Sequence, residues 1–371
     1  MKEKKLGQIV ILIAFAVIIC LSRVIWFCTE KYLDSENYEN RYMADQPRFT
    51  LDSYSTYSAD YSDYFNDNLQ FRNSLIQLNS SIDYFVFRRS SNKTVIVGKD
   101  NWLFYGKSDE SEDSISNYLG TDLCSDDELE TIAQNCVAQR DYLLEQGKEF
   151  VIFIAPNKER IYSEYMPDHY GEPAEIYGVL QIYNYLKENT DLRVVYPYNE
   201  LMETKEILEE NIYQKTDTHW NYIGAYVGAS ALLSELGIEM PQIYSEEITI
   251  MDNGESSGDL AKALNMRNQL KFADRAYSVS GYPLHNAKQV ELEDGIVSYN
   301  AEDADPRSIY FIRDSFTTHM LPYIGSQFSE SCFSDVQTYT YDDLSIRNPD
   351  IVVYETIERK AKVRLETFSI Q

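Results

Sequence analysis

A serine and an aspartate–histidine pair are the residues of this chain whose types could act together in catalysis. Asp217 and His219 stand two positions apart in the stretch KTDTHWNY, and Ser315 follows later in RDSF. A serine becomes a useful nucleophile only when a base removes its proton and a third group orients that base. In extended backbone, residues two apart point to the same side, so the Asp217 carboxylate could approach the His219 imidazole.

Each of these residues also has a purely structural interpretation. Ser315 could cap the helix that is expected after it. In the same way, Asp217 or Thr218 could cap the helix that follows the histidine. His319 stands four residues after Ser315 and would share a helix face with it, as a reserve base or a substrate contact.

The elements around Ser315 predict where a base would have to meet it. The run SIYFI at Ser308–Ile312 predicts a buried strand that leads directly into the RDSF turn. Ligands of open α/β sheets bind beyond the carboxyl ends of the strands, which is where Ser315 would lie. Backbone N–H groups at the start of the following helix could stabilise an oxyanion there.

Further apolar runs predict the rest of the sheet. EFVIFIAP, RVVYPY and DIVVYE are typical of buried strands, and helical patterns separate them, one of them opening on a capping box at Ser125 and Glu128. This alternation predicts an α/β fold with an open, mostly parallel sheet flanked by helices. Residues 240–303 break the alternation, and KQVELEDGIVSYN predicts a small β-hairpin insertion on the rim of the sheet.

The N-terminus carries a localisation signal. Three lysines precede an apolar segment over residues 6–28, which is long enough to be a transmembrane helix with its N-terminus inside. A cleaved signal peptide is the alternative, and in both cases the rest of the chain is exported. We therefore expect a cytoplasmic tip and anchor (1–28), a membrane-proximal, partly helical region rich in Tyr and Asp (29–93), and a catalytic domain (94–371).

Composition narrows the classes of partner. The formal net charge of −27 repels phosphates, which argues against nucleic acid. The chain has no phosphate-binding glycine loop, nucleotide fingerprint or zinc-type Cys/His spacing, so no cofactor or metal is predicted. Its 31 tyrosines each offer an apolar ring face and a hydroxyl, a combination that suits contacts with sugars.

The two motifs together resemble a known family. TDTHWN followed by RDSF is similar to the DHHW proteins and the related alginate O-acetylation proteins of the SGNH-hydrolase-like group. ENRYMADQP, FNDNLQFRNSLI, IVGKDNWLFY, APNKERIYSEYMP and NPDIVVYETIER agree with it, so the resemblance covers the chain from about residue 39. The tetrapeptide SGDL at Ser257–Leu260 also fits the family, and we interpret it as a turn.

The resemblance implies a circularly permuted SGNH-type domain, in which the Asp/His pair precedes the serine. Ser315 would be the nucleophile, His219 the general base and Asp217 its orienting carboxylate. The implied reaction transfers an acetyl group to hydroxyls of an exported polysaccharide, with the acetyl group supplied through a multi-pass membrane acyltransferase. A carbohydrate esterase with the same triad, and an inert glycan-binding or scaffold component of an export complex, are the alternatives.

The sequence departs from the family pattern at two positions near the motifs. Arg313 stands where ordinary SGNH hydrolases carry glycine, and Thr218 replaces the second residue of the DHHW motif. Lys158 is equally well explained as a surface charge. The candidate substrate-binding or oxyanion residues are Arg313, Asn157, Lys158, Trp220 and His319.

Overall fold

The structure is a computed structural model that describes residues 9, 11–17, 21, 25–28, 31, 42–69, 71–109, 112–291 and 296–370. Ten of the 23 residues of the predicted anchor (6–28) fall outside these residues, so the segment is described only in part. Among the residues that are described, no helix is long and apolar enough to cross a membrane.

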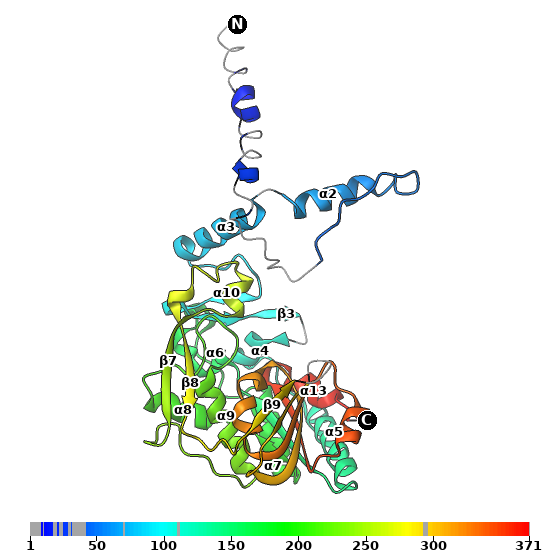
Figure 1. Cartoon of the computed structure of the whole chain (residues 1–371), viewed down its shortest axis with the longest axis vertical. Coiled ribbons are helices and arrows are strands. Elements are labelled where there is room, and N and C mark those ends of the chain that lie inside the picture. Colours follow the sequence, from blue (N-terminus) through cyan, green and yellow to red (C-terminus); the bar gives the residue numbers. More distant parts are fainter. Residues whose placement is uncertain are drawn as a thin grey trace. The chain divides into compact units, whose positions relative to one another are not determined.

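The chain divides into two compact units. The first comprises Met1–Ser91 with Lys262–Met266 and contains helices α2 (Tyr57–Asp67) and α3 (Arg72–Phe87). The second comprises Asn92–Ala261 with Arg267–Gln371 and runs from cyan to red in Figure 1. All candidate site residues lie in this second unit.

A seven-stranded sheet forms the centre of the second unit, in the order β6-β5-β13-β11-β12-β10-β9. The first five of these strands pair in parallel, and β10 and β9 extend the edge as an antiparallel hairpin. The prediction of an open, mostly parallel sheet is therefore confirmed. The strands are β5 (Glu149–Ala155), β6 (Arg193–Val195), β9 (Lys288–Glu291), β10 (Val297–Asn300), β11 (Asp305–Arg313), β12 (Phe328–Asp335) and β13 (Ile351–Ile357).

Helices cover both faces of this sheet. All seven residues of β13 are buried, because its apolar side chains alternate between two hydrophobic clusters on opposite faces. Figure 1 shows α5 and α13 together, apart from α8 and α9. One cluster contains side chains of α5 (Asp126–Leu144), α7 (Gly178–Asn189), α12 (Tyr341–Arg347) and α13 (Glu358–Thr367). The other contains side chains of α8 (Tyr198–Ile207), α9 (Tyr222–Glu235) and α11 (Leu321–Gly325).

The predicted capping box is confirmed: Ser125 caps α5, and the reciprocal bond with Glu128 is present. The residues on either side of the GKDN stretch form an antiparallel pair of strands. The other small elements are β1 (Val95–Val97), β2 (Leu103–Tyr105), β3 (Lys107–Asp109), β4 (Glu112–Asp113), α4 (Ser114–Leu119), α6 (Lys158–Ile161), α10 (Asp259–Ala263) and the 3-10 turn η7 (Ser315–His319).

The insertion is larger than one hairpin. Within residues 240–303, β7 (Thr249–Ser256) and β8 (Asp274–Ser280) form their own antiparallel pair. The predicted hairpin is the β9–β10 pair, and its DG turn at residues 294–295 lies outside the described residues. The hairpin belongs to the rim of the central sheet, as expected.

Candidate active site

The structure brings Ser315, His219 and Asp217 into one hydrogen-bonded row. His219 Nε2 lies 2.8 Å from Ser315 Oγ, and His219 Nδ1 lies 2.6 Å from Asp217 Oδ1. Ser315 is exposed, whereas the other two side chains are largely covered. The nucleophile-to-base and base-to-carboxylate contacts that serine catalysis requires are therefore both present.

The turn that carries Ser315 is capped by Asp314. Asp314 Oδ1 accepts the N–H of Phe316 at 3.0 Å, so the interpretation of Ser315 as the helix cap is wrong. Asp314 Oδ2 accepts the N–H of Ile357 at 3.0 Å and a guanidinium N–H of Arg364 at 2.8 Å. The neighbour of Ser315 thus carries the structural bonds and leaves the serine hydroxyl free for His219.

A buried carboxyl group supports the same turn from β13. Glu355 Oε2 accepts the backbone N–H of Asp314 at 2.6 Å and the hydroxyl of Thr317 at 3.0 Å. Burial, together with the nearby Asp314 carboxylate, raises the pKa of Glu355 well above its ordinary value. Glu355 therefore holds the turn through two hydrogen bonds to a buried carboxyl group.

The loop that carries Asp217 and His219 is not a helix cap either. Asn221 caps α9, because its side-chain oxygen accepts the N–H of Ile223 at 2.9 Å. The interpretation of Asp217 or Thr218 as that cap is therefore wrong. Asp217 Oδ1 accepts the backbone N–H of His219 at 3.0 Å, which folds the carboxylate back toward the imidazole.

The SGDL stretch holds Asp217 from the other side. The backbone N–H of Asp259 donates to Asp217 Oδ2 at 2.8 Å. A Cβ atom on Gly258 would lie 2.2 Å from the Cβ of Asp217, so only glycine fits at this position. Sequence reasoning treated this stretch as a turn and missed that it positions the carboxylate.

Asp259 also binds Thr218, the residue that departs from the DHHW motif. Its carboxylate accepts the backbone N–H of Thr218 at 2.8 Å and the hydroxyl at 2.6 Å, and lies 3.8 Å from His219 Nδ1. Ligand atoms of Asp217, His219 and Asp259 lie within 4.8 Å of one another, a spacing that could hold a metal ion. Because these atoms already bond to each other, to Thr218 and to backbone N–H groups, we assign the cluster to orienting the imidazole.

Burial and the mutual charges of Asp217, His219 and Asp259 shift the pKa values of these three side chains. Burial acts to raise the pKa of Asp217, but the hydrogen bond and charge of His219 outweigh it and hold the pKa below its ordinary value. Burial acts to lower the pKa of His219, and the Asp217 carboxylate reverses this, so the pKa of His219 is raised. Burial and the Asp217 charge raise the pKa of Asp259.

Lys158 is neither a surface charge nor exposed to a substrate. Its side chain is 1 % exposed, and its ammonium group donates to the backbone oxygens of Gln214 at 3.1 Å and Asp217 at 2.5 Å. It lies 5.7 Å from the ring centre of Trp102. Burial lowers the pKa of Lys158 to about 8. Lys158 therefore anchors the loop that presents Asp217.

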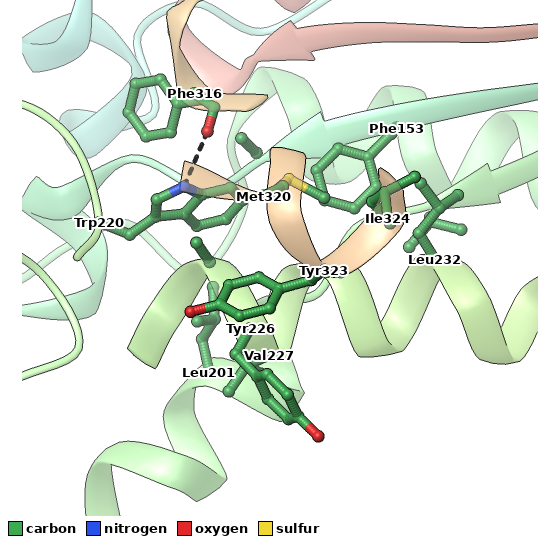
Figure 2. Close-up of a cluster of buried hydrophobic side chains, with 14 of the residues drawn as sticks. Phe153, Leu201, Trp220, Tyr226, Val227, Leu232, Phe316, Met320, Tyr323 and Ile324 are labelled. Carbon is green, nitrogen blue, oxygen red and sulfur yellow. Dashed lines mark hydrogen bonds between the residues drawn. The ribbon is translucent and has the colours of Figure 1, made fainter. Parts of the chain in front are cut away.

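Trp220 joins the two halves of the site from below. It is fully buried, and its indole N–H donates to the backbone oxygen of Phe316 at 2.9 Å, the dashed line in Figure 2. Figure 2 also shows Met320 beside the indole, between it and Phe153 of the central sheet. Trp220 is thus a packing residue that sets the spacing of the two loops, and the expectation of a substrate contact is wrong.

His319 does not replace His219 as the base. It lies in the tight 3-10 turn η7, and its ring packs edge-on against Tyr222 with centroids 4.6 Å apart. Burial, with the nearby His219, lowers the pKa of His319 to about 4. It is therefore a neutral side chain in the wall of the site.

The two remaining candidates for substrate or oxyanion binding, Asn157 and Arg313, are surrounded by other groups of the protein. Asn157 is 1 % exposed, and its backbone N–H donates to Glu358 Oε2 at 2.7 Å. Its side-chain amide has no hydrogen-bond partner among the described residues and does not reach solvent. Arg313 ends β11 and donates to the backbone oxygen of Asp314 at 3.2 Å and to Thr318 Oγ1 at 3.3 Å.

Arg359 is a residue of this site that sequence reasoning did not select. Its guanidinium carbon lies 4.6 Å from the ring centre of Tyr105 and 5.8 Å from that of Phe316, and its Nε donates to Glu112 at 3.3 Å. It follows β13 by two residues, as Ser315 follows β11, and these strands are neighbours. This position, two residues after the end of a strand next to β11, was the signal in the sequence that could have identified Arg359 as a site residue.

The fold and this row of side chains define an SGNH-hydrolase-like domain, and comparison identifies its family. The family described as "SGNH hydrolase-like domain, acetyltransferase AlgX" matches residues 95–309, more than half of the chain. The chain belongs to this family, and the predicted resemblance is confirmed. The match contains Asp217 and His219 and ends before Ser315.

Curated relatives match part of the chain. A probable alginate O-acetylase AlgJ of Pseudomonas syringae pv. tomato is 25% identical over 179 residues, which are 48% of this chain and 42% of the relative. The AlgJ of Pseudomonas putida is 29% identical over 140 residues, 37% of this chain and 32% of the relative. The match thus spans less than half the length of these relatives.

Solved structures share the fold. PatB1 of Bacillus cereus superposes with a TM-score of 0.52 at 15% sequence identity, covering 75% of this chain and 98% of PatB1. A DHHW family protein of Eubacterium siraeum gives a TM-score of 0.51 at 14% identity, covering 75% of this chain and 96% of that protein. At this identity the likeness concerns the fold alone.

Proposed function

We propose that this protein is a serine O-acyltransferase, most simply an O-acetyltransferase, that modifies hydroxyl groups of a polysaccharide outside the cytoplasm. The observation that carries the proposal is the row Ser315 Oγ, His219 and Asp217, with contacts of 2.8 and 2.6 Å. The family description, which names an acetyltransferase, and the relatives named as probable alginate O-acetylases support acetyl transfer to a glycan.

The first half-reaction forms an acyl-enzyme. Ser315 Oγ attacks the carbonyl carbon of the acyl donor while His219 Nε2 takes the hydroxyl proton. When the tetrahedral intermediate collapses, the bond to the leaving group breaks and His219 returns the proton to that group. The Ser315 backbone N–H would donate to the oxyanion, and the Arg359 guanidinium, whose carbon lies 5.8 Å from the Phe316 ring centre, would add positive charge near the turn.

The second half-reaction moves the acyl group to the acceptor. A sugar hydroxyl gives its proton to His219, its oxygen attacks the acyl carbon, and the ester bond to Ser315 breaks. The serine oxygen then recovers a proton from His219. Asp217 stays ionised throughout, because the bonds to His219 and the Asp259 N–H hold its pKa low.

The cellular setting follows from the sequence. The apolar segment over residues 6–28 would anchor the protein in the cell membrane with its N-terminus inside, or act as a signal peptide. A multi-pass membrane acyltransferase would supply the acyl group to the exported domain.

An esterase is the second candidate function, because Ser315 is exposed to solvent and water could replace the sugar hydroxyl.

Replacement of the nucleophile tests the proposal. We expect Ser315→Ala to fold normally but to lose turnover of a chromogenic acetyl ester, labelling by a fluorophosphonate probe, and acetyl transfer to oligosaccharide. The control Ser345→Ala changes an exposed serine on α12 and should keep all three. Equal labelling and turnover in Ser315→Ala and wild type would refute the mechanism. Ester turnover that ignores added oligosaccharide would favour the esterase.

A further inference from the structure

A tyrosine-lined cavity lies beside the carboxyl ends of β5 and β6, apart from the residues around Ser315. Its volume is about 430 Å³. Its walls come from Arg160 in α6, from α7 and the segment that leads into it, and from Tyr196 and the first residues of α8. Four tyrosines line it: Tyr177, Tyr183, Tyr196 and Tyr198.

Two of these tyrosines form a rigid back wall. Tyr177 and Tyr196 are buried, and their hydroxyl groups lie 3.0 Å apart. Tyr196 also donates to Glu358 Oε2 at 3.0 Å. The guanidinium carbon of Arg160 lies 3.5 Å from the centre of the Tyr177 ring. The wall is therefore pre-organised, which lowers the entropy that a ligand would have to remove on binding.

The other two tyrosines, Tyr183 and Tyr198, are only partly buried. The ring of Tyr198 is nearly parallel to that of Tyr196, with centroids 6.0 Å apart and planes at 14°. The exposed residues Glu175, Asn199 and Glu200 line the same cavity and offer oxygen acceptors and an amide donor. Aromatic faces with a few polar groups around them suit a pyranose ring, which has apolar C–H faces and a belt of hydroxyl groups.

We propose that this cavity binds an uncharged pyranose residue of the glycan acceptor. Carboxylates of Glu175 and Glu200 at the cavity, and the net charge of −27, disfavour an anionic sugar. Among the lining residues Arg160 is the only cation. Its Nη1 and Nη2 already donate to the backbone oxygens of Ala174 and Asn117, at 2.8 and 2.9 Å.

The cavity is placed to hold the glycan at a distance from the reacting hydroxyl. The strands β6, β5, β13 and β11 are consecutive in the sheet, so β6 and β11 lie roughly 14 Å apart across three strand spacings. Both the cavity and Ser315 lie beyond the carboxyl ends of these strands. A short oligosaccharide spans such a distance, so one sugar can occupy the cavity while another presents its hydroxyl to His219. This inference rests on the proposed acyl transfer.

Substitution of Tyr198 tests the cavity in the full-length protein. We expect neutral gluco- and galacto-oligosaccharides of four to six residues to bind the wild type more tightly than oligouronates of equal length, as measured by calorimetry. Tyr198→Ala should weaken this binding at least tenfold, while Tyr198→Phe, which keeps the ring, should retain it. Tyr244→Ala is the control, because Tyr244 is exposed and does not line this cavity. Turnover of the small acetyl ester should be equal in all four proteins.

The outcomes separate this inference from the proposed function. Unchanged oligosaccharide affinity in Tyr198→Ala, tighter binding of oligouronates, or no binding of any neutral oligosaccharide by the wild type would each overturn the cavity assignment. Sugar binding that depends on Tyr198 in a protein that neither turns over the ester nor labels at Ser315 would overturn the acyltransferase and leave the cavity as a glycan-binding site.

Discussion

At the scale of single residues, the site depends on groups that never touch the substrate. Lys158 and Asp259 hold the loop of Asp217 through backbone bonds, and Asp314 takes the capping role that leaves Ser315 free. For the buried groups Lys158 and Asp314 these bonds matter, because an unmade bond of a buried polar group costs about 1–3 kcal/mol. These neighbouring residues thus hold Ser315, His219 and Asp217 in position without taking part in the reaction.

Arg359 gives a prediction at this scale. His219 must be neutral to accept a proton, so kcat/KM should rise with pH through a midpoint above 6.5, since its pKa is raised. The Arg359 charge lowers the pKa of His219, so Arg359→Gln should move this midpoint to higher pH. The measurement is the pH profile of acetyl-ester turnover.

The matched control is Lys360→Gln. Lys360 also pairs with Glu112, at 3.1 Å, so this variant reports the loss of that pairing alone. An Arg359→Gln profile that coincides with the wild-type profile would show that the guanidinium does not act on His219.

At the scale of elements, two loops meet because packing beneath them sets their spacing. The loop before α9 and the turn after β11 are joined by the Trp220 indole and the backbone of Phe316, over the apolar cluster in Figure 2. The SGDL turn approaches the first loop so closely at Gly258 that a Cβ atom there would lie 2.2 Å from the Cβ of Asp217. A change in these supports would displace the base from the nucleophile.

Gly258→Ala tests this element-scale coupling. The added methyl group would collide with Asp217, so the carboxylate must move away from His219. A misplacement of about 1 Å can cost roughly 10²-fold in rate, and we expect a loss of that order in kcat with a small change in thermal stability. Gly106→Ala is the control, because its Cβ would meet only ordinary contacts at 3.5 Å. Wild-type turnover in Gly258→Ala would contradict this account of the Asp217 support.

At the scale of the whole molecule, a strongly acidic chain buries several carboxyl groups beneath the strand ends. Burial raises the pKa of Glu355, under the nucleophile turn, well above its ordinary value. Burial also raises the pKa of Glu358 to about 7, although Arg160 lies 3.6 Å away. Glu358 bonds to the N–H of Asn157 and the hydroxyl of Tyr196, so it connects the active-site edge to the tyrosine-lined cavity.

The stability of the fold should therefore depend on pH through Glu358. Its pKa is raised from 4.5 to about 7 on folding, so its contribution is complete below pH 4.5 and is lost as the pH rises through 7. Glu358→Gln keeps the hydrogen-bond acceptor without the charge and should reduce the decline in unfolding free energy between pH 5 and 8 by up to roughly 3 kcal/mol. Urea unfolding at several pH values measures this difference.

The exposed Glu145→Gln serves as the control for removal of one negative charge. If Glu358→Gln and Glu145→Gln lose stability with pH in parallel with the wild type, Glu358 is already ionised in the fold and the prediction fails.

Sequence alone determined the features that repeat locally. Apolar runs predicted the strands of a mostly parallel sheet, and the capping box predicted the start of α5. These predictions succeed because burial and capping depend on residues within a few positions of each other. The pairing of Ser315 with His219 and Asp217, almost a hundred residues apart, was implied by the family resemblance and not by a local pattern.

Only the tertiary structure decided which polar side chains face the site. Lys158 and Trp220 proved to be buried supports, while Asp259 and Arg359 entered the site from distant segments. Their roles depend on contacts between strand ends and loops that lie far apart in the chain, and local patterns carry no record of such contacts. The tyrosine-lined cavity has the same origin, because its wall joins α6, α7 and α8 around the end of the sheet.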